Sequence, residues 1–355
     1  MLGAGLAFEH LHLPALRAHP RFLIDAVYDP VRGRAEPVCA VFPAAELASS
    51  AYAVMAKPGL DAIVVLTPPE SHAELTLEAL AQGRAVLVEK PMTTGVDAAD
   101  AVVRGAREVG RPVLVGYNRR HRRTYRTLRA RLGRASPRRL EFKLVAELER
   151  WSRADGGSED LLDDLGSHGV DLLPWIARRR LAEVRARAGP DGGLRIDGEL
   201  EGGVEIRMHV TRGPRYIEWL VAEAREASWF AHPGGVIPAR IAPPPVRDWI
   251  AAVGVASDAA AARLAGRPTL TWRSMVRLFD DLAARLDGRP GLGGADAAAG
   301  RRAVEAVWDC RVSLESGGRP VRVGRAGAVG PADARVPPDA PPIEAVDAIE
   351  TLEAS

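Results

Sequence analysis

Residues 61–91 read DAIVVLTPPESHAELTLEALAQGRAVLVEKP, which is two apolar runs on either side of a helical pattern. The runs 62–66 and 85–88 are continuously apolar, as is typical of strands buried on both faces. The segment between them carries leucines at helical spacing. A strand, a helix and a second strand in this order predict parallel strands joined by a right-handed crossover.

The same alternation extends over the first third of the chain. A strand pattern at 22–28 precedes the quoted stretch, and a helical pattern at 96–109 leads to another strand pattern at 112–115. Strands that alternate with helices predict an α/β fold with a doubly wound parallel sheet. We place this first domain at residues 1–118.

The pattern changes from about residue 138. Segments 140–144, 183–188, 204–211 and 216–230 alternate apolar and polar residues, as strands with one solvent-facing side do. Helical patterns lie at 159–177, 271–287 and 299–315, and the apolar positions of the last two indicate core packing. We place a second domain at 119–324.

Composition limits the classes of protein that fit. The chain has 355 residues, of which 47% are hydrophobic and 26% charged, with a net charge of +2. That length suits two domains of ordinary size. Residues 325–355 hold six acids against two arginines, a net of −4, which leaves +6 for the rest. This acidic tail is rich in Pro and Ala, so we expect disorder there, with a short docking helix at 343–352 as the alternative.

Nothing in the sequence points to a membrane or to metal. The chain has no apolar run of about 18 residues and no signal-peptide pattern at its start. Cys39 and Cys310 are too few for a disulfide framework and lack zinc-ligand spacing. We therefore expect a cytoplasmic protein with no membrane partner and no metal site.

Glycines and an acid mark a candidate nucleotide site. Gly3 and Gly5 lead into a helical pattern, and Asp29 follows a strand pattern 24 residues after Gly5. Such glycines let a backbone approach a pyrophosphate, and the acid would accept a hydrogen bond from a ribose hydroxyl. A tight turn and a surface acid are the alternative. Phe8 stands where a third Gly or Ala is expected, so we expect it to crowd the packing or the phosphate turn.

Other polar clusters follow the strands. They are Thr67-Pro68-Pro69, Glu89-Lys90-Pro91 and Tyr117-Asn118-Arg119. Ligands of doubly wound sheets bind beyond the carboxyl ends of the strands, so these clusters and Asp29 are expected at one edge.

Residues 163–171, DDLGSHGVD, form a second candidate cluster. In a helix, Asp164 and His168 lie on one face, with Asp171 one turn further on. A histidine beside a carboxylate is suited to general-base catalysis, with a pKa near the working pH. A solvated helix face with a structural histidine is the alternative.

A basic segment runs from Arg119 to Arg131. Tyr125, Leu128 and Leu132 recur in it at helical spacing, so we expect an amphipathic helix with a solvated basic face and no nucleic-acid partner. Arg119 and Arg120 follow the last strand of the first domain. We expect them to enter the substrate cleft, where a phosphorylated or nucleotide-linked sugar would suit them.

Taken together, these motifs resemble one family. Gly3-x-Gly5, Asp29, Thr-Pro-Pro-x-x-His at 67–72, Glu-Lys-Pro at 89–91 and Asp-x-Gly-x-His at 164–168 are similar to the glucose–fructose oxidoreductase / inositol dehydrogenase family, Gfo/Idh/MocA. The similarity in order and spacing runs from Gly3 to about Val323. It implies a Rossmann domain and a C-terminal α+β domain with an open, largely antiparallel sheet. The face of that sheet commonly builds a homodimer or homotetramer in the family.

The resemblance also implies roles. Lys90 would lie near the nicotinamide and substrate, with a cis bond to Pro91. His168 would take the hydroxyl proton as hydride leaves for the nicotinamide, and Asp164 would bind substrate or polarise His168. The cofactor would be lined by Gly3, Gly5, Asp29, Thr67, Pro68, His72 and Glu89. Asp29 favours NAD, and Arg32 and Arg34 keep NADP as the alternative.

The first strand departs from the family pattern. It should precede Gly3 by about five or six residues, but only Met1 and Leu2 stand there. Its neighbours would then lie about 9–10 Å apart and leave backbone groups unpaired. A start assigned too late, a rearranged sheet and a degenerate copy are the three explanations, and we favour the first.

The expected function is that of an NAD(P)-dependent oxidoreductase acting on a secondary alcohol or ketone of a sugar, cyclitol or sugar derivative. A degenerate, non-catalytic relative that binds a nucleotide or a partner is one alternative. An NAD-dependent glycosidase is another, since glycosidases of that kind resemble this family.

Overall fold

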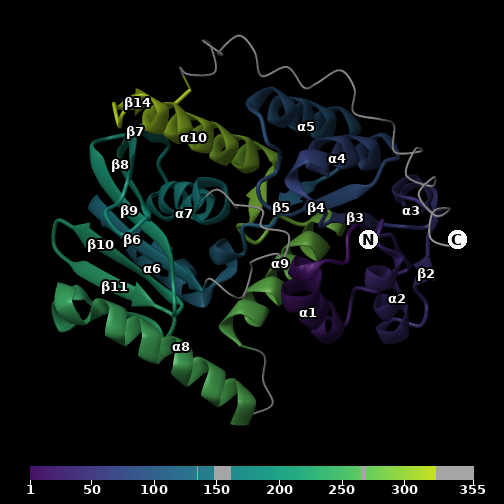
Figure 1. Ribbon diagram of the computed structural model, residues 1–355, viewed down its shortest axis with the longest axis horizontal. Coiled ribbons are helices and arrows are strands. Elements are labelled where there is room, and N and C mark those ends of the chain that lie inside the picture. The colour runs from purple at the N-terminus through teal and green to yellow at the C-terminus, as the bar shows by residue number, and fades with distance from the viewer. Residues whose placement is uncertain (134, 148–160, 265–268, 325–355) are drawn as a thin grey trace, which may run out of the picture.

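Residues 1–133, 135–147, 161–264 and 269–324 are described by the computed structural model of the chain (Figure 1). In these ranges the strands build a mostly parallel sheet from the N-terminal part and an eight-stranded, mostly antiparallel sheet from the later part. The predicted combination of two kinds of sheet is confirmed. The domain limits 1–118 and 119–324 stay predictions, and the predicted tail at 325–355 lies outside the described residues.

The first sheet has the predicted parallel strands at its centre. Its strands are β3 (Ala62–Val65), β4 (Ala85–Val88), β5 (Val113–Val115) and β13 (Ala295–Asp296), and a parallel pair beside them is β1 (Ala26–Val27) and β2 (Glu46–Leu47). β3, β4 and β5 are parallel, and β13 runs antiparallel to β5. All four residues of β4 are buried, as the unbroken apolar run predicts.

A two-residue stub takes the place of the central strand. Leu2 forms parallel bridges with Tyr28 after β1 and with Val65 of β3, through backbone hydrogen bonds of 2.8–2.9 Å. The stub therefore joins the β1–β2 pair to the rest of the sheet, and the strand order is not rearranged. The amino group of Met1 is buried and donates to the carbonyl oxygen of Ala26 at 2.6 Å, and burial lowers its pKa to about 5.

Helices cover both faces of this sheet. They are α1 (Leu13–Ala18), which continues a π-helical turn at Phe8–His12, then α2 (Arg32–Val41), α3 (Ala51–Ala56), α4 (His72–Ala81) and α5 (Val96–Val109). Two later helices, α9 (Leu270–Leu286) and α10 (Ala297–Glu315), complete the faces. Phe279 of α9 packs on the α1–α2 side, and Val304 of α10 packs on the α4–α5 side. The predicted core role of these helices is confirmed.

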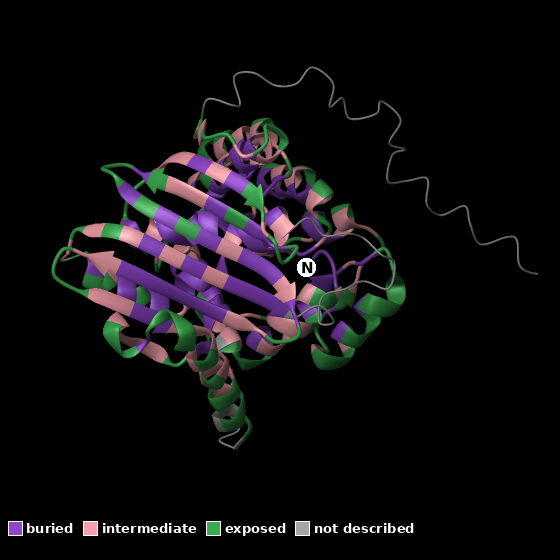
Figure 2. Ribbon diagram, turned by 60° about the vertical axis from the view of Figure 1, so that its left-hand side comes forward, coloured by how far each residue is buried: buried purple, intermediate pink, exposed green. Residues whose placement is uncertain are grey.

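The second sheet has the order β12-β11-β10-β6-β9-β8-β7-β14, and β6 and β9 are its parallel pair. Its strands are β6 (Pro137–Glu147), β7 (Leu181–Ala188), β8 (Leu194–Leu200), β9 (Val204–Gly213), β10 (Ile217–Ala224), β11 (Ser228–His232), β12 (Gly235–Pro238) and β14 (Val321–Arg322). One face packs on α6 (Arg123–Leu132), α7 (Ser167–Ala177) and α10 around an apolar cluster. On the other face, α8 (Arg247–Leu264) covers part of β10 and β11 (Figures 1 and 2).

Some element limits differ from the prediction. The segment expected as one alternating unit at 216–230 is a hairpin of β10 and β11, because the chain turns between Ala224 and Ser228. The strand expected at 22–28 is reduced to the two residues of β1. β8 and α8 were not expected. Within the described ranges, no helix is both long enough and apolar enough to cross a membrane.

Candidate functional site

The glycine turn after the stub requires a glycine at one position and leaves space at the other. Gly3 has φ +88, and a Cβ there would lie 2.7 Å from the carbonyl oxygen of Leu66, so a side chain does not fit. A Cβ at Gly5 would meet no atom within 4 Å. The protein itself therefore does not require glycine at position 5, whereas a ligand close to the backbone would.

Asp29 holds this turn. One of its carboxylate oxygens accepts the N–H of Ala4 at 2.8 Å, and the other accepts the N–H of Val31 at 2.9 Å. The side chain lies at the predicted strand end and is nearly buried, so part of its hydrogen-bonding capacity serves the fold. Its role toward a ribose stays a prediction.

Phe8 does not enter the turn. Its side chain is buried in the apolar cluster that contains Leu66 and Phe279, on the side of the sheet covered by α1 and α9. The helix is π-helical at this point, with the N–H of Leu13 donating to the carbonyl oxygen of Phe8. The expected crowding of the phosphate turn is therefore wrong, because the side chain points into the core.

His12, at the end of this π-helical turn, contacts the Glu-Lys-Pro motif. Its Nε2 lies 2.7 Å from Oε1 of Glu89, and the other oxygen of Glu89 accepts the N–H of Lys90 at 3.0 Å. Burial acts to raise the pKa of Glu89, but the contacts with His12 and with the N–H of Lys90 bring it below its ordinary value. Glu89 is thus a carboxylate fixed between the first helix and the loop after β4.

His72 connects two of the predicted strand-end loops. Its ring nitrogens each lie 2.7 Å from a carbonyl oxygen, one of Thr67 and one of Pro91. His72 is 1% exposed, so its ring holds the two loops together in the interior and does not face a cleft. The hydroxyl of Thr67 accepts a hydrogen bond from Ser71 at 2.7 Å. Pro68 follows Thr67 in the same loop. Contact of this loop with a cofactor stays a prediction.

Lys90 meets the second motif directly. The Lys90-Pro91 bond is cis, as expected. The ammonium of Lys90 lies 2.8 Å from Oδ1 of Asp164 and 3.0 Å from its carbonyl oxygen, although the two residues are 74 positions apart. The second oxygen of Asp164 accepts from Arg212 of β9 at 3.1 Å. Lys90, Asp164 and Arg212 are each about one-fifth exposed, so this charged group borders solvent.

His168 lies one helical turn after Asp164, in the first turn of α7. Its ring stands edge-on to Tyr117, with 6.2 Å between ring centres. Within the described residues, Nδ1 of His168 is buried and has no hydrogen-bond partner. Burial and the nearby charges of Arg119 and Lys90 hold the pKa of His168 well below its ordinary value. The expected pKa near the working pH is therefore wrong for this structure, because burial and the neighbouring cations disfavour the protonated ring.

Arg119 and Arg120 form buried ion pairs. Arg119 donates to Glu218 of β10 at 2.9 Å, and Arg122 and Tyr125 bind the other oxygen of that carboxylate. Arg120 binds Asp171 of α7 through both carboxylate oxygens. These pairs hold the segment after β5 against the second sheet and α7. The substrate role predicted for the two arginines stays a prediction.

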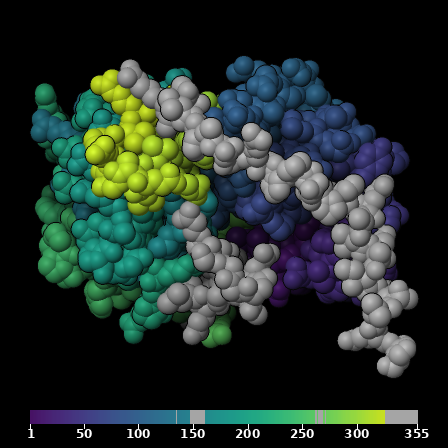
Figure 3. Space-filling model, turned by 45° about the horizontal axis from the view of Figure 1, so that its top comes forward, coloured from purple at the N-terminus to yellow at the C-terminus, as the bar shows by residue number. Residues whose placement is uncertain are grey.

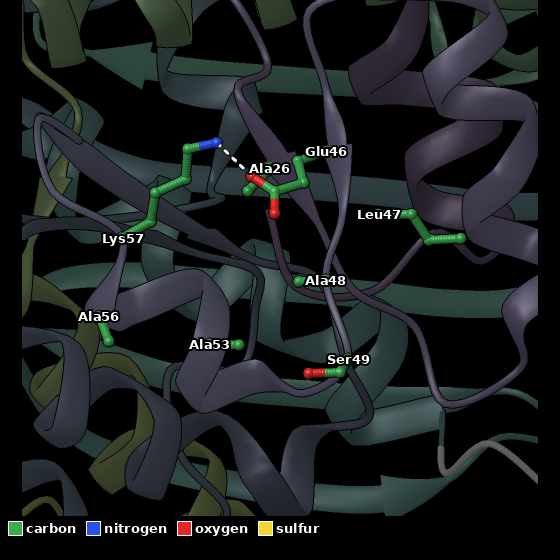
Figure 4. A pocket seen from close by; sticks show the side chains of 8 residues that line it. All are labelled: Ala26, Glu46, Leu47, Ala48, Ser49, Ala53, Ala56 and Lys57. Carbon is green, nitrogen blue, oxygen red and sulfur yellow. Dashed lines mark hydrogen bonds and ion pairs between the residues drawn. The ribbon is translucent and has the colours of Figure 1, made fainter.

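The structure also adds residues that sequence reasoning missed. Arg212, His12 and Glu218 contact predicted site residues from elements 48–99 positions away in the chain. A charged residue at the end of a predicted strand was the sole sequence signal for Arg212. Separately, a cavity of about 440 Å³ lies between the β1–β2 pair and α3 (Figure 4), and no predicted site residue lines it. No group of three or more potential metal ligands occurs in the described ranges.

Comparison with known proteins finds a family match in the N-terminal part of the chain. Residues 1–117 match the model of an oxidoreductase family with an NAD-binding Rossmann fold. The scyllo-inositol 2-dehydrogenase (NADP(+)) IolW of Bacillus subtilis is 29% identical over 178 residues, which cover 48% of this chain and 49% of that protein. An inositol 2-dehydrogenase of Mycolicibacterium smegmatis is 38% identical over 107 residues, 30% of this chain and 31% of that protein. The chain thus spans at most about half the length of these two relatives.

The fold similarity extends further than the sequence similarity. A myo-inositol dehydrogenase structure from Corynebacterium glutamicum superposes with a TM-score of 0.70 at 19% identity, and covers 93% of this chain and 98% of that one. At this identity, the similarity establishes the shared two-sheet fold.

Proposed function

The chain belongs to the Gfo/Idh/MocA oxidoreductase family, and from this premise we propose that it is an NAD(P)-dependent dehydrogenase or reductase of a sugar, cyclitol or sugar derivative. The reaction would interconvert a secondary alcohol and a ketone. NAD is the proposed cofactor, with NADP as the alternative, because relatives named for each cofactor occur in Bacillus subtilis.

One contact carries this proposal. Lys90 from the first sheet and Asp164 from the segment leading into α7 are joined at 2.8 Å, one helical turn from His168. A cation and a neutral imidazole are thereby brought to one place at the carboxyl edge of the parallel strands. That edge is where doubly wound sheets bind dinucleotides.

The chain offers a fitting place for the cofactor. The open Cβ position of Gly5, at the start of the first helix, would allow a pyrophosphate to approach the backbone N–H groups. We propose that Gly3, Gly5 and Asp29 hold the phosphate and ribose part, and that the loops at Thr67 and Glu89 hold the rest. When bound, the nicotinamide would accept or supply the hydride.

His168 would manage the proton. Its lowered pKa keeps the imidazole neutral near pH 7, which is the form that can accept a proton from an alcohol. A buried nitrogen without a partner is unfavourable until a ligand binds it. Lys90, held by Asp164, would place a positive charge beside the substrate oxygen and favour the alkoxide-like state.

The test begins with cofactor binding. A thermal-shift titration with NAD and with NADP should raise the melting temperature, by the equivalent of about 2.7 kcal/mol at 100 times the dissociation constant. A panel of sugars and cyclitols, followed by the absorbance of the reduced nicotinamide, would then identify the substrate. Absence of a shift with both cofactors would refute the proposal.

The two alternatives give different results. A degenerate relative would bind one of the two cofactors or neither of them. It would reduce neither NAD nor NADP with any sugar or cyclitol of the panel. An NAD-dependent glycosidase would cleave chromogenic glycosides with NAD in catalytic amounts and no net reduction.

We also propose that the protein is a cytoplasmic homodimer or homotetramer. Support comes from the face of the second sheet over β6 and β9, which Figure 2 shows without a covering helix. Light scattering coupled to gel filtration would give the mass of the assembly.

A further inference from the structure

A second cavity, of about 990 Å³, lies away from the Lys90–His168 group. Its walls come from α5, α6, α7 and α10 and from the start of β7, between the two sheets. Figure 3 shows the end of α10 (yellow) beside the teal elements of the second sheet on this side of the molecule. Neither Lys90 nor His168 lines it, whereas Arg120, one of the two predicted substrate residues, does.

The lining carries a large excess of positive charge. Nine arginines face four acidic residues, an excess of five charges, whereas the whole chain has a net charge of +2. Three of the four acids already pair with arginines, since Asp171 binds Arg120, and Asp100 and Glu305 bind Arg301. The carboxylate of the fourth, Glu201, accepts the backbone N–H of Arg180 at 3.5 Å. Among the lining arginines, only Arg120 and Arg301 pair with an acidic side chain in the described ranges. The other seven lining arginines have no acidic side chain within ion-pair distance there, namely Arg104, Arg107, Arg129, Arg178, Arg179, Arg180 and Arg302.

These arginines repel one another. Burial and the neighbouring charges of Arg178 and Arg120 lower the pKa of Arg129 to about 10. Burial also lowers the pKa of Arg302; the charge of Asp296 offsets part of this, and the charge of Arg120 adds to it. A cluster of cations that lowers the pKa of its own members is short of negative charge.

Arg178 adds a backbone observation. It ends α7 in the left-handed conformation, with φ 58 and ψ 37, and is the one non-glycine residue with positive φ in the described ranges. Glycine or asparagine usually takes this position. A cation suits the end of a helix, but the adjacent Arg179 would supply that charge without strain. An unfavourable backbone conformation retained by an arginine at the cavity wall supports a role for its side chain there.

The cavity also has an apolar wall. Trp175 and Pro174 line it, and the guanidinium of Arg129 lies 4.5 Å from the centre of the Trp175 ring. Together with the arginines, this wall can hold a ligand with an organic body and several negative charges. Arginine guanidinium groups match phosphate oxygens in geometry as well as in charge.

We propose that this cavity is a binding site for an organic phosphate with at least two negative charges, apart from the Lys90–His168 group. Arg178, Arg129 and Arg302 bind the phosphate groups, and Trp175 contacts the organic part. The ligand then supplies the negative charge that the described lining lacks. Arg120 lines the cavity and binds Asp171 of α7, so the bound ligand would lie against α7, the helix that carries His168.

The test uses the full chain with saturating NAD, so that phosphate probes do not compete for the cofactor site. Inorganic tripolyphosphate is the charge probe, and fructose 1,6-bisphosphate is the organic probe, both measured by calorimetry at low salt. We expect one binding site for each probe, and weaker binding of sulfate at equal ionic strength.

Two variants and one control decide the location. Arg178→Gly removes the guanidinium and relieves the left-handed conformation, so its melting temperature should match that of the parent while binding weakens at least tenfold. Arg302→Gln should weaken binding by a similar factor. Arg131→Gln makes the same charge change on α6, two positions from Arg129 and outside the cavity, and should bind as the parent does.

Other results would overturn the proposal. No saturable binding of either probe, unchanged affinity in both cavity variants, or an equal loss in Arg131→Gln would each do so. The readout is the binding of phosphates in the presence of NAD. A negative result would therefore overturn this proposal without bearing on the proposed dehydrogenase activity, which is tested separately.

Discussion

Two alanine substitutions in the glycine turn should have opposite consequences. At Gly3, φ +88 disfavours any L-residue, and the new Cβ would lie 2.7 Å from the carbonyl oxygen of Leu66. The conformation alone costs about 1–2 kcal/mol, and displacement of the Leu66 backbone adds to it. Gly3→Ala should therefore lower the free energy of unfolding by about 3 kcal/mol or more, which is similar to the cost of inserting extra atoms into a packed core.

Gly5→Ala should leave stability almost unchanged, because its Cβ points into open space. Its effect should fall on the cofactor, which the methyl group would keep away from the helix N-terminus. A loss of about 1–2 kcal/mol of binding energy corresponds to about 5–30-fold in the dissociation constant.

The assay is a melting curve of each variant with and without NAD, together with a calorimetric titration. Gly3→Ala should melt early without any cofactor, and Gly5→Ala should melt with the parent and shift less on adding NAD. Parent-like NAD affinity in Gly5→Ala would refute the phosphate role of the turn. An unchanged melting temperature in Gly3→Ala would refute the close approach to Leu66.

Three further predictions concern the charged groups. Glu218→Gln removes a buried carboxylate shared by two arginines and should cost about 3–5 kcal/mol in denaturant unfolding, whereas Glu223→Gln on the same strand should cost little. The contacts of Glu218 lower its pKa to about 2, so the stability that it contributes is present above about pH 4.5 and is lost as the pH falls towards 2. If the acid unfolding curve of Glu218→Gln were the same as that of the parent, this prediction would be contradicted. The lowered pKa of His168 predicts that kcat/KM for alcohol oxidation has no acid limb between pH 8 and about 6.5, and a midpoint at or above about 6.5 would contradict the assignment. Asp164→Asn removes the shared carboxylate of Lys90 and Arg212, so kcat should fall while cofactor affinity is kept; equal turnover would remove Asp164 from the site.

Local sequence patterns predicted what depends on local structure. The continuous apolar run of β4 was enough to predict a strand buried on both faces. The spacing of Asp164 and His168 was enough to place them one helical turn apart, because a helical turn is set by nearby residues. The outcome for Phe8 could not be predicted, since its position depends on a π-helical turn and on the distant Phe279.

Long-range charge pairing was beyond local patterns. The sequence offers Asp164 an apparent partner in His168 one turn away, but in the fold its carboxylate binds Lys90 and Arg212. Likewise, the arginines after β5 read as a basic surface, although Arg119 is buried against Glu218. Which acid neutralises which base depends on tertiary packing.

The proposed proton transfer at His168 is tested most directly by separating cofactor binding from hydride transfer. The measurement compares His168→Ala with the parent and with the control His209→Ala, a histidine on the second sheet that binds Asp191. We expect equal NAD affinity in all three proteins and a rate of cofactor reduction about 10²–10⁴-fold lower in His168→Ala alone. Equal rates in His168→Ala and the parent, on a substrate that the parent oxidises, would contradict it.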